Sequence, residues 1–157
     1  MGVFSFESET VVAVAPARLF KAYVLDGVNF FPKVIPGMKI EILEGDGGAG
    51  TVKNITFAVP HNTHVKHRID LVDKESLVYN YSIIEGHVLG EDTEKLEFKS
   101  KIVPSPDGGS IWKSTATYYT KGDAVITEEK HKAAEERGKG LYKAIEAYLL
   151  NNPNEYN

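Results

Sequence analysis

The chain has 157 residues, of which 42% are hydrophobic and 25% charged, a composition that fits one globular domain with its own core. The formal net charge is −4 and the basic residues are scattered, which argues against a nucleic-acid partner. There is no cysteine and no apolar run near the ~20 residues of a membrane span, so we expect neither disulfides nor a membrane partner.

The first quarter of the chain predicts a strand followed by two short helices. The segment from Val3 to Val12 alternates and is rich in β-forming residues. Pro16 suits the first turn of a helix that ends at Gly27. A second short helix is expected over residues 30–35, interrupted by Pro32.

Six further strand-like runs, separated by turn residues, follow the helices. They are residues 39–44, 51–58, 64–72, 77–85, 93–103 and 110–120. Short connections favour antiparallel pairing. The sequence therefore predicts a single α+β domain over residues 1–157, in which a curved seven-stranded antiparallel sheet holds one long C-terminal helix.

That helix is predicted from Thr127 to Asn152. Thr127 is a suitable cap, and Pro153 disfavours the helical conformation of the residue before it. The inward stripe is bulky in its second half but offers only Ala134 and Gly138 in its first half. Either large side chains from the sheet fill the space opposite, or the first half of the helix borders a cavity.

Strand alternation suggests which side chains face this helix. The inward sets mix large aromatic side chains with hydroxyls, and this is the make-up of a small-molecule site more than of a purely packed core. The sets are Val52, Ile55 and Phe57, with a break in phase that a bulge would absorb; Tyr79, Tyr81 and Ile83; Leu96, Phe98, Ser100 and Ile102; and Ser110, Trp112, Ser114, Ala116 and Tyr118.

A glycine-rich segment, Gly45, Gly47, Gly48 and Gly50, matches the dinucleotide pattern G-x-G-x-x-G by letter. That pattern works only where the loop opens a helix that receives the pyrophosphate. Here a predicted strand follows, and Lys53 lies three residues beyond the last glycine. We interpret the segment as a rigid turn, with weak anion binding by its amides as the alternative, and we expect no cofactor.

His61, His64 and His67 have a spacing that invites a metal-site interpretation. In an extended chain, positions three apart point to opposite faces, so the three rings do not converge and we predict no metal site. His67 shares its parity with Val65, Ile69 and Leu71. It is therefore either a polar group facing a pocket or a satisfied core histidine.

Several segments resemble the plant class-ten pathogenesis-related family, to which the major birch pollen allergen belongs. The matching segments are Gly2-Val3-Phe4, Leu19-Phe20-Lys21-Ala22, Glu44-Gly45-Asp46-Gly47-Gly48, Gly50-Thr51-Val52-Lys53, Ile84-Glu85-Gly86, Tyr119-Thr120-Lys121-Gly122-Asp123, Ile145-Glu146-Ala147-Tyr148-Leu149-Leu150 and Glu155-Tyr156-Asn157. They are spread over the whole chain.

The resemblance implies an apolar cavity under the long helix, and relatives that are cytosolic, induced in defence and often allergens. By position, the cavity lining corresponds to Tyr23, Phe57, His67, Tyr79, Tyr81, Phe98, Gly138, Leu141 and Tyr142. We add Trp112 from the inward wall, His64 because it stands where the family often has an aromatic residue, and Arg137. The Arg137 guanidinium either favours an acidic or polyphenolic ligand at the cavity rim or points into solvent.

Three functions follow from the resemblance. The first is a cytoplasmic, monomeric protein that binds small amphipathic metabolites (flavonoids, cytokinins or other hormones, steroids or fatty acids) without covalent chemistry. The second is a ribonuclease, for which Lys53, Glu94, Glu146 and Tyr148 match the proposed positions, although the same residues also suit charged surface positions. The third is hormone reception with phosphatase inhibition, as in more distant relatives. It is disfavoured because those relatives carry a Ser-Gly-Leu-Pro-Ala gate, whereas residues 58–62 here read Ala-Val-Pro-His-Asn.

Overall fold

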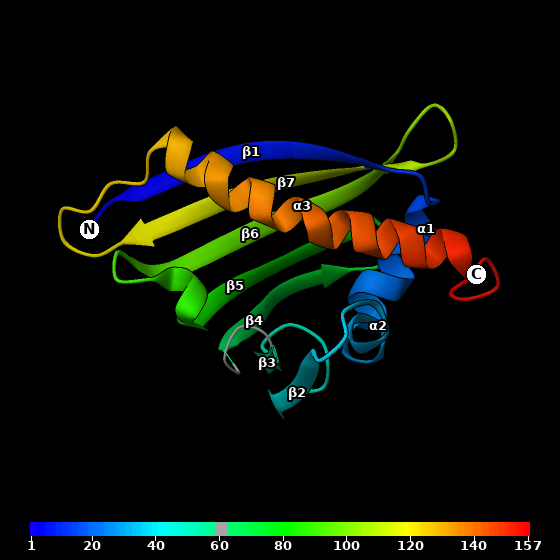
Figure 1. Cartoon of the computed structure of the whole chain (residues 1–157), viewed down its shortest axis with the longest axis horizontal. Helices are drawn as coiled ribbons and strands as arrows, with labels where there is room; N and C mark the ends of the chain where they lie inside the picture. The colour runs from blue at the N-terminus through cyan, green and yellow to red at the C-terminus, as the bar shows by residue number, and fades with distance from the viewer. Residues whose placement is uncertain (59–62) are drawn as a thin grey trace.

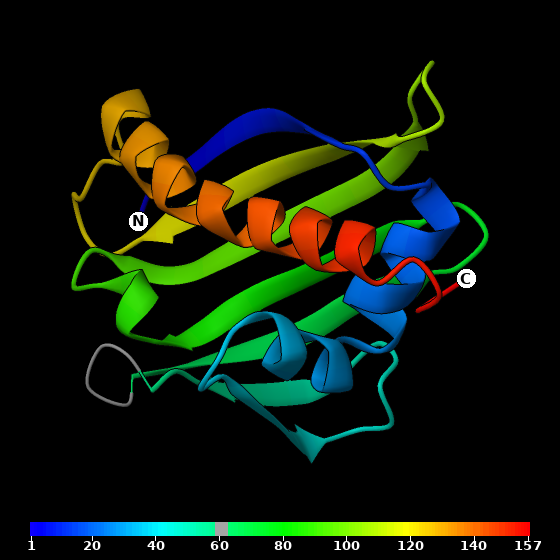
Figure 2. The same cartoon turned by 45° about the vertical axis from the view of Figure 1, so that its right-hand side comes forward.

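A computed structural model describes residues 1–58 and 63–157. Seven strands form one antiparallel sheet in the order β1-β7-β6-β5-β4-β3-β2, and the long helix α3 lies across it (Figures 1 and 2). The elements are β1 (Val3–Val12), α1 (Pro16–Phe20), the π-helical turn η1 (Lys21–Leu25), α2 (Gly27–Val34), β2 (Lys39–Glu44), β3 (Val52–Thr56), β4 (His64–Asp73), β5 (Val78–Gly86), the 3-10 turn η2 (His87–Leu89), β6 (Thr93–Pro104), β7 (Ser110–Thr120) and α3 (Glu128–Asn151).

The predicted architecture is confirmed, and β1, β2 and β7 have the predicted bounds. One detail of the short helices was wrong, because Pro32 lies inside α2 and does not interrupt it. Pro32 is exposed and stands in the last part of this eight-residue helix. There its missing amide removes one hydrogen bond near the helix end without forcing its ring into a neighbour.

Bulges curve the sheet and change which side chains face inward. The pairing of β4 with β5 shifts register between Lys66 and His67 and again between Ile69 and Leu71. A bulge adds one residue to one strand, so it reverses the alternation beyond it. Leu71 is therefore 44% exposed, and the expectation that it shares the inward face of Val65 and Ile69 was wrong.

The two ends of α3 are held by identified groups. The Thr127 hydroxyl accepts a hydrogen bond from the Lys130 amide at 3.1 Å, which confirms the predicted cap. At the other end, Arg18 of α1 donates to the carbonyl oxygens of Leu149 at 2.7 Å, Asn152 at 2.8 Å and Glu155 at 2.9 Å. The last carbonyls of a helix have no intrahelical partner, and one guanidinium supplies it here.

The residues after α3 fold back onto the short helices. The Tyr156 hydroxyl donates to Asp26 at 2.6 Å, and the Tyr148 hydroxyl donates to the Glu155 carboxylate at 2.9 Å. Lys33 of α2 also contacts Glu155, at 3.2 Å. Together with Arg18, these contacts fix α1, α2 and the C-terminal half of α3 to one another at one end of the molecule (Figure 1).

Candidate ligand-binding site

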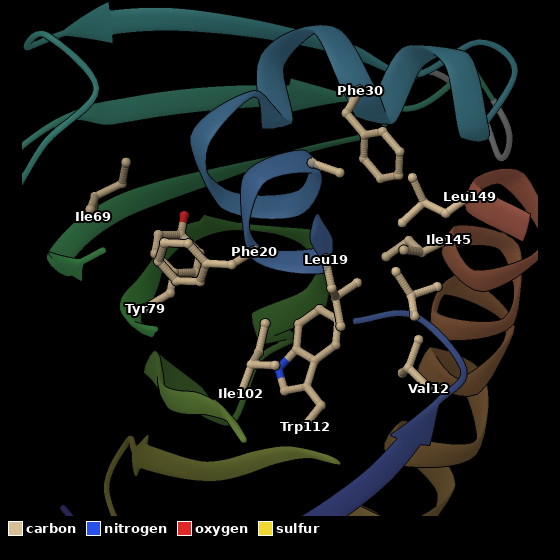
Figure 3. Close-up of a cluster of buried hydrophobic side chains, with 12 residues drawn as sticks. Val12, Leu19, Phe20, Phe30, Ile69, Tyr79, Ile102, Trp112, Ile145 and Leu149 are labelled. Carbon is tan, nitrogen blue, oxygen red and sulfur yellow. The ribbon is translucent and has the colours of Figure 1, made fainter. Parts of the chain in front are cut away.

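The buried side chains divide into two clusters, and only the first includes residues of α3. We call the first the helix-end core (Figure 3). Its buried members are Val12, Val14, Leu19, Phe20, Ala22, Phe30, Ile69, Tyr79, Ile102, Trp112, Ile145 and Leu149. It packs the second half of α3 against the short helices and one end of the sheet.

We call the second cluster the sheet cluster. Its buried members are Met38, Ile55, Val65, Ile83, Leu89, Leu96 and Ala116, and partly buried aromatic side chains, including Phe57, Tyr81, Phe98 and Tyr118, pack against it. Among the described residues, α3 contributes no side chain to this cluster. The apolar face of the sheet therefore extends beyond the part that α3 covers with its own apolar residues.

The first half of α3 is fixed to the sheet by His131. The imidazole ring stacks on Phe6 of β1, with ring centroids 4.4 Å apart. Its Nδ1 atom is 2.9 Å from the Tyr118 hydroxyl of β7, and its Nε2 atom is 3.1 Å from the Glu135 carboxylate. The helix is thus anchored at His131 near its start and by the helix-end core near its end.

Between these anchors, the inward stripe of α3 is underfilled. Gly138 lies seven residues, or two helical turns, from both His131 and Ile145, which are buried. A Cβ atom built on Gly138 meets no heavy atom within 4 Å. The sheet does not close over this position, so the hypothesis that large side chains fill the space opposite Gly138 is not supported.

A continuous row of aromatic side chains lines the interior, and we call it the aromatic row. On the sheet, Tyr81 stacks with His67, Tyr79 and Phe98, with ring centroids 4.7, 5.2 and 5.1 Å apart. The row continues from Tyr79 to Tyr23 at 5.7 Å, to Trp112 at a further 4.3 Å and to Tyr142 of α3 at a further 4.6 Å. Seven of the predicted lining residues are therefore brought together from six elements.

The phenol groups in this row are kept protonated. Burial raises the pKa of Tyr81 and Tyr79 well above their ordinary value, and it also raises the pKa of Tyr142. Burial is likewise the main reason why the pKa of Tyr23 is high, with Tyr81, Tyr79 and Tyr142 adding to the effect. Each phenol therefore remains a neutral hydroxyl that can donate one hydrogen bond and accept others.

Lys53 belongs to the same interior, which the sequence analysis missed. It was considered only for acid–base chemistry, and Val52 was assigned to the inward face. The structure shows no bulge between β3 and β4, and Lys53 and Ile55 are the buried residues of β3. The sequence could have predicted this orientation, because Lys53 alternates in register with the apolar residues Ile55 and Phe57.

The remaining predicted lining residues occupy different surroundings. Leu141 packs against the helix-end core, and Phe57 lies at the sheet cluster with its ring 6.3 Å from that of His87. The His64 side chain is 48% exposed and its Nε2 atom lies 3.1 Å from the Glu85 carboxylate, so it does not join the aromatic row.

Arg137 is exposed on α3, and of the two expectations for its side chain the structure favours solvent. Its charge still acts on Tyr118, which packs against the sheet cluster. Burial raises the pKa of Tyr118, and the Arg137 guanidinium partly opposes that rise.

Two of the predicted inward serines, Ser100 and Ser110, donate to the backbone. The Ser100 hydroxyl donates to the Tyr79 carbonyl oxygen at 2.7 Å, and the Ser110 hydroxyl donates to that of Val14. Trp112 is 3% exposed and packs between Tyr23 and Tyr142. These residues support the wall of the interior and leave the tyrosine hydroxyls, His67 and Lys53 as its polar groups.

The four residues considered for ribonuclease chemistry are spread over the molecule. Glu94 lies at the start of β6, while Glu146 accepts a hydrogen bond from the Ala13 amide at 2.8 Å, just beyond β1. The strand register places the end of β1 beside the C-terminal end of β6. Glu94 lies at the N-terminal end of β6, about ten residues or roughly 30 Å away. Tyr148 contacts Glu155 at the end of α3, and Lys53 faces the interior. The structure does not assemble them into one site.

The glycine-rich turn is built from its own contacts. Gly45, Gly47 and Gly50 have φ values of 94°, 102° and 90°, which residues with a Cβ atom rarely adopt. The Gly47 amide donates to the Thr51 hydroxyl at 2.8 Å and the Gly48 amide to the Asp46 carboxylate at 3.0 Å. These two amides already have acceptors, which favours the rigid-turn interpretation over anion binding.

The predictions on metal binding and on the gate loop depend partly on residues outside the described part of the chain. His61 and residues 59–62 of the loop lie there. Among the residues that the structure describes, no group of three or more potential ligands is placed to hold a metal ion.

Two surface depressions among the described residues lie away from the aromatic row. One, of about 480 Å³, lies on the outer face of the sheet over Glu9, Lys99 and Lys113. The other, of about 490 Å³, lies beside α2 and the edge strand β2. Both are open to solvent and contain no aromatic side chain, so neither has the make-up of an amphipathic-ligand site.

Known proteins match this chain along almost its full length. Residues 1–152 match the pathogenesis-related protein Bet v 1 family. Class-10 pathogenesis-related protein 1 of Medicago truncatula is 53% identical over 155 residues, covering 98% of this chain and 99% of that protein. The chain belongs to the Bet v 1 family.

Two further matches agree with this assignment. The major strawberry allergen Fra a 1-2 of Fragaria ananassa is 52% identical to this Bet v 1 family protein over 159 residues, covering 99% of each chain. The crystal structure of Ara h 8.0201 superposes with a TM-score of 0.85 at 44% identity, covering 96% of this chain and 99% of the other. The resemblance inferred from the sequence is therefore confirmed.

Membership of the Bet v 1 family implies a defence-related protein that binds ligands. In the described part of the chain, no helix has both the length and the apolar character needed to cross a bilayer.

Proposed function

We propose that this Bet v 1 family protein binds small amphipathic plant metabolites, without covalent chemistry, between the first half of α3 and the aromatic row. The flavonoids, cytokinins and other hormones, steroids and fatty acids implied by the resemblance are the ligand classes we expect. We expect it to act as a cytoplasmic monomer. The observation that carries this proposal is the open space beside Gly138 on the inward stripe of α3.

The state of the interior side chains supports the proposal. Burial dominates the pKa shifts of Tyr23, Tyr81 and His67, yet all three side chains keep part of their accessible surface. A group that is removed from bulk water but not covered by protein atoms borders an internal space. Aromatic faces with a few hydroxyl groups suit a flat ligand that has a small number of polar substituents.

Gly138→Leu is expected to weaken ligand binding while it stabilises the empty protein. A leucine side chain would occupy the open space, and replacing a helical glycine adds about 1 kcal/mol of helix propensity. The affinity for the neutral dye N-phenyl-1-naphthylamine, measured by fluorescence titration, should fall about tenfold or more, since the site would lose the volume of a whole side chain.

Gly140→Leu is the matched control. Gly140 lies in the same helix and also meets no atom within 4 Å, but it is exposed. This variant should gain similar stability in urea unfolding and bind the dye as the wild type does. Wild-type dye affinity in Gly138→Leu would show that the ligand does not lie beneath this turn.

A further inference from the structure

We propose that the interior ligand carries an anionic group, such as a carboxylate, which is held by the Lys53 ammonium with Tyr79 and His67 beside it. The proposal rests on the ligand-binding function above and specifies the chemistry of the ligand. It starts from a cation that β3 directs into the apolar interior.

Among the residues that the structure describes, none is an adequate partner for the ammonium group of Lys53. Its side chain is buried, with 9% of the residue exposed. Its Nζ atom is 3.5 Å from the Tyr79 hydroxyl, at the outer limit of a hydrogen bond, and 5.9 Å from the centre of the Tyr79 ring. Among the described residues no carboxylate forms an ion pair with Lys53, and the remaining residues 59–62 are Val, Pro, His and Asn.

A buried cation without an anion is unfavourable, because water no longer solvates it. Burial alone lowers the pKa of Lys53 to about 8, and no carboxylate in the described part of the chain opposes the shift. A ligand anion at the Nζ atom would supply the missing charge in a region of low dielectric constant, where such a pair is strong. In most proteins an acidic side chain neutralises a buried lysine, and here the anionic group of the ligand would do so.

The described groups that face Lys53 carry no negative charge and so do not repel an anion. His67, its partner across β3 and β4, remains neutral because burial and the Lys53 charge lower its pKa to about 3. The Tyr79 hydroxyl remains protonated and can donate.

One carboxylate of β4, that of Asp70, acts on Tyr79 and helps to raise its pKa. This carboxylate is already held by the Ser82 hydroxyl at 2.6 Å and by Arg68 at 2.9 Å. No unpaired negative charge therefore competes for Lys53 in the described part of the interior.

Two dyes of nearly the same shape test the inference. The dye 8-anilinonaphthalene-1-sulfonate carries a sulfonate, whereas N-phenyl-1-naphthylamine lacks it. Lys53→Met should weaken binding of the sulfonate dye about tenfold or more while the affinity for the neutral dye changes less than about twofold. Lys99→Met, at a lysine that is 65% exposed on the outer face of β6, should change neither affinity.

Calorimetry on the wild-type protein gives a second measurement that does not depend on the folding of a variant. At pH 8.5 part of the Lys53 population is deprotonated, and an anion that pairs with it must restore the proton. Titrations in two buffers with different ionisation enthalpies should show uptake of a fraction of a proton with the sulfonate dye and none with the neutral dye.

The outcomes separate this inference from the proposed function. Binding of both dyes with an unchanged affinity ratio in Lys53→Met, or binding of the sulfonate dye without proton uptake, overturns the role of Lys53 alone. Failure of the wild type to bind either dye overturns the ligand-binding proposal and this inference with it.

Discussion

Two single residues, Lys53 and His67, make the stability of this protein rise with pH, each in its own pH range. Both are basic groups in an interior that disfavours their charged forms. Each loses protons on folding in its own pH range, and the slope of stability with pH follows the difference in bound protons between the unfolded and folded states.

For Lys53 we predict that stability rises between pH 8 and 10. Its pKa falls from 10.5 in the unfolded chain to about 8 in the folded protein, so the unfolded state binds more protons across this range. The free energy of unfolding should increase by roughly 2–3 kcal/mol, given 1.36 kcal/mol per pKa unit. Urea unfolding at pH 7.5 and 10 measures it, and Lys53→Met should remove the increase. A parallel increase in that variant would assign the effect to other groups.

For His67 we predict a loss of stability in acid. Its pKa falls from 6.5 to about 3, so below pH 6.5 the unfolded chain takes up a proton that the folded protein excludes. Between pH 7.5 and 4.5 this contributes about 2 kcal/mol of destabilisation, after allowance for the partial exposure of the ring. His67→Gln should lose correspondingly less stability over this interval than the wild type.

His64→Gln is the control for this experiment. His64 lies on the same strand, but its side chain is 48% exposed beside Glu85. Its ring is exposed, so the loss of hydration that penalises the charged form of His67 is absent there, and His64→Gln should not reproduce the acid resistance of His67→Gln. The assignment to His67 would be wrong if both glutamine variants behaved alike.

Among the secondary-structure elements, α3 is supported at its two ends and left bare between them. The His131 contacts with Phe6 and Tyr118 hold its start, and Ile145 and Leu149 hold its end. Gly138 lies between these supports. A helix held in this way can border an internal space without being packed along its whole length.

Arg18 is the residue through which α1 supports the end of α3, and we predict that Arg18→Met costs about 2–4 kcal/mol of unfolding free energy. The variant keeps the apolar stem but leaves the carbonyl oxygens of Leu149, Asn152 and Glu155 without their donor. Urea unfolding measures the loss.

Lys21→Met offers a comparison with one exposed contact. Lys21 donates to the carbonyl oxygen of Asn157 at 2.9 Å. Its loss should cost less than about 0.5 kcal/mol, as is usual at the surface. Equal costs for Lys21 and Arg18 would show that the geometry of the guanidinium does not matter.

For the molecule as a whole, the order and type of elements could be predicted from local signals. Thr127 and Pro153 define the ends of α3, and alternation defines the strands. Prediction failed where tertiary structure overrides a local pattern. The bulge beyond Ile69 turned Leu71 outward, and Pro32 was tolerated within α2.

The candidate site could be predicted only in part. The resemblance and the alternation together identified the aromatic row, and the bare patch at Gly138 was visible as a small residue on an apolar stripe. Lys53 was missed because a charged residue in a strand usually faces solvent. The exposed position of His64 beside Glu85 was not predicted, because the contact between these two strands depends on sheet register, which cannot be deduced from the local sequence.

The pairing of β1 with β7 also has a consequence for how this protein is made. Val12 lies opposite Ser110, so β1 emerges from the ribosome about 100 residues before its partner, roughly 5–20 s at ordinary rates of translation. Arg18 is synthesised even longer before Leu149, whose carbonyl oxygen it binds. During that interval β1 is an unpaired strand, and the exposed charges of Glu7 and Glu9 on it disfavour pairing with another chain.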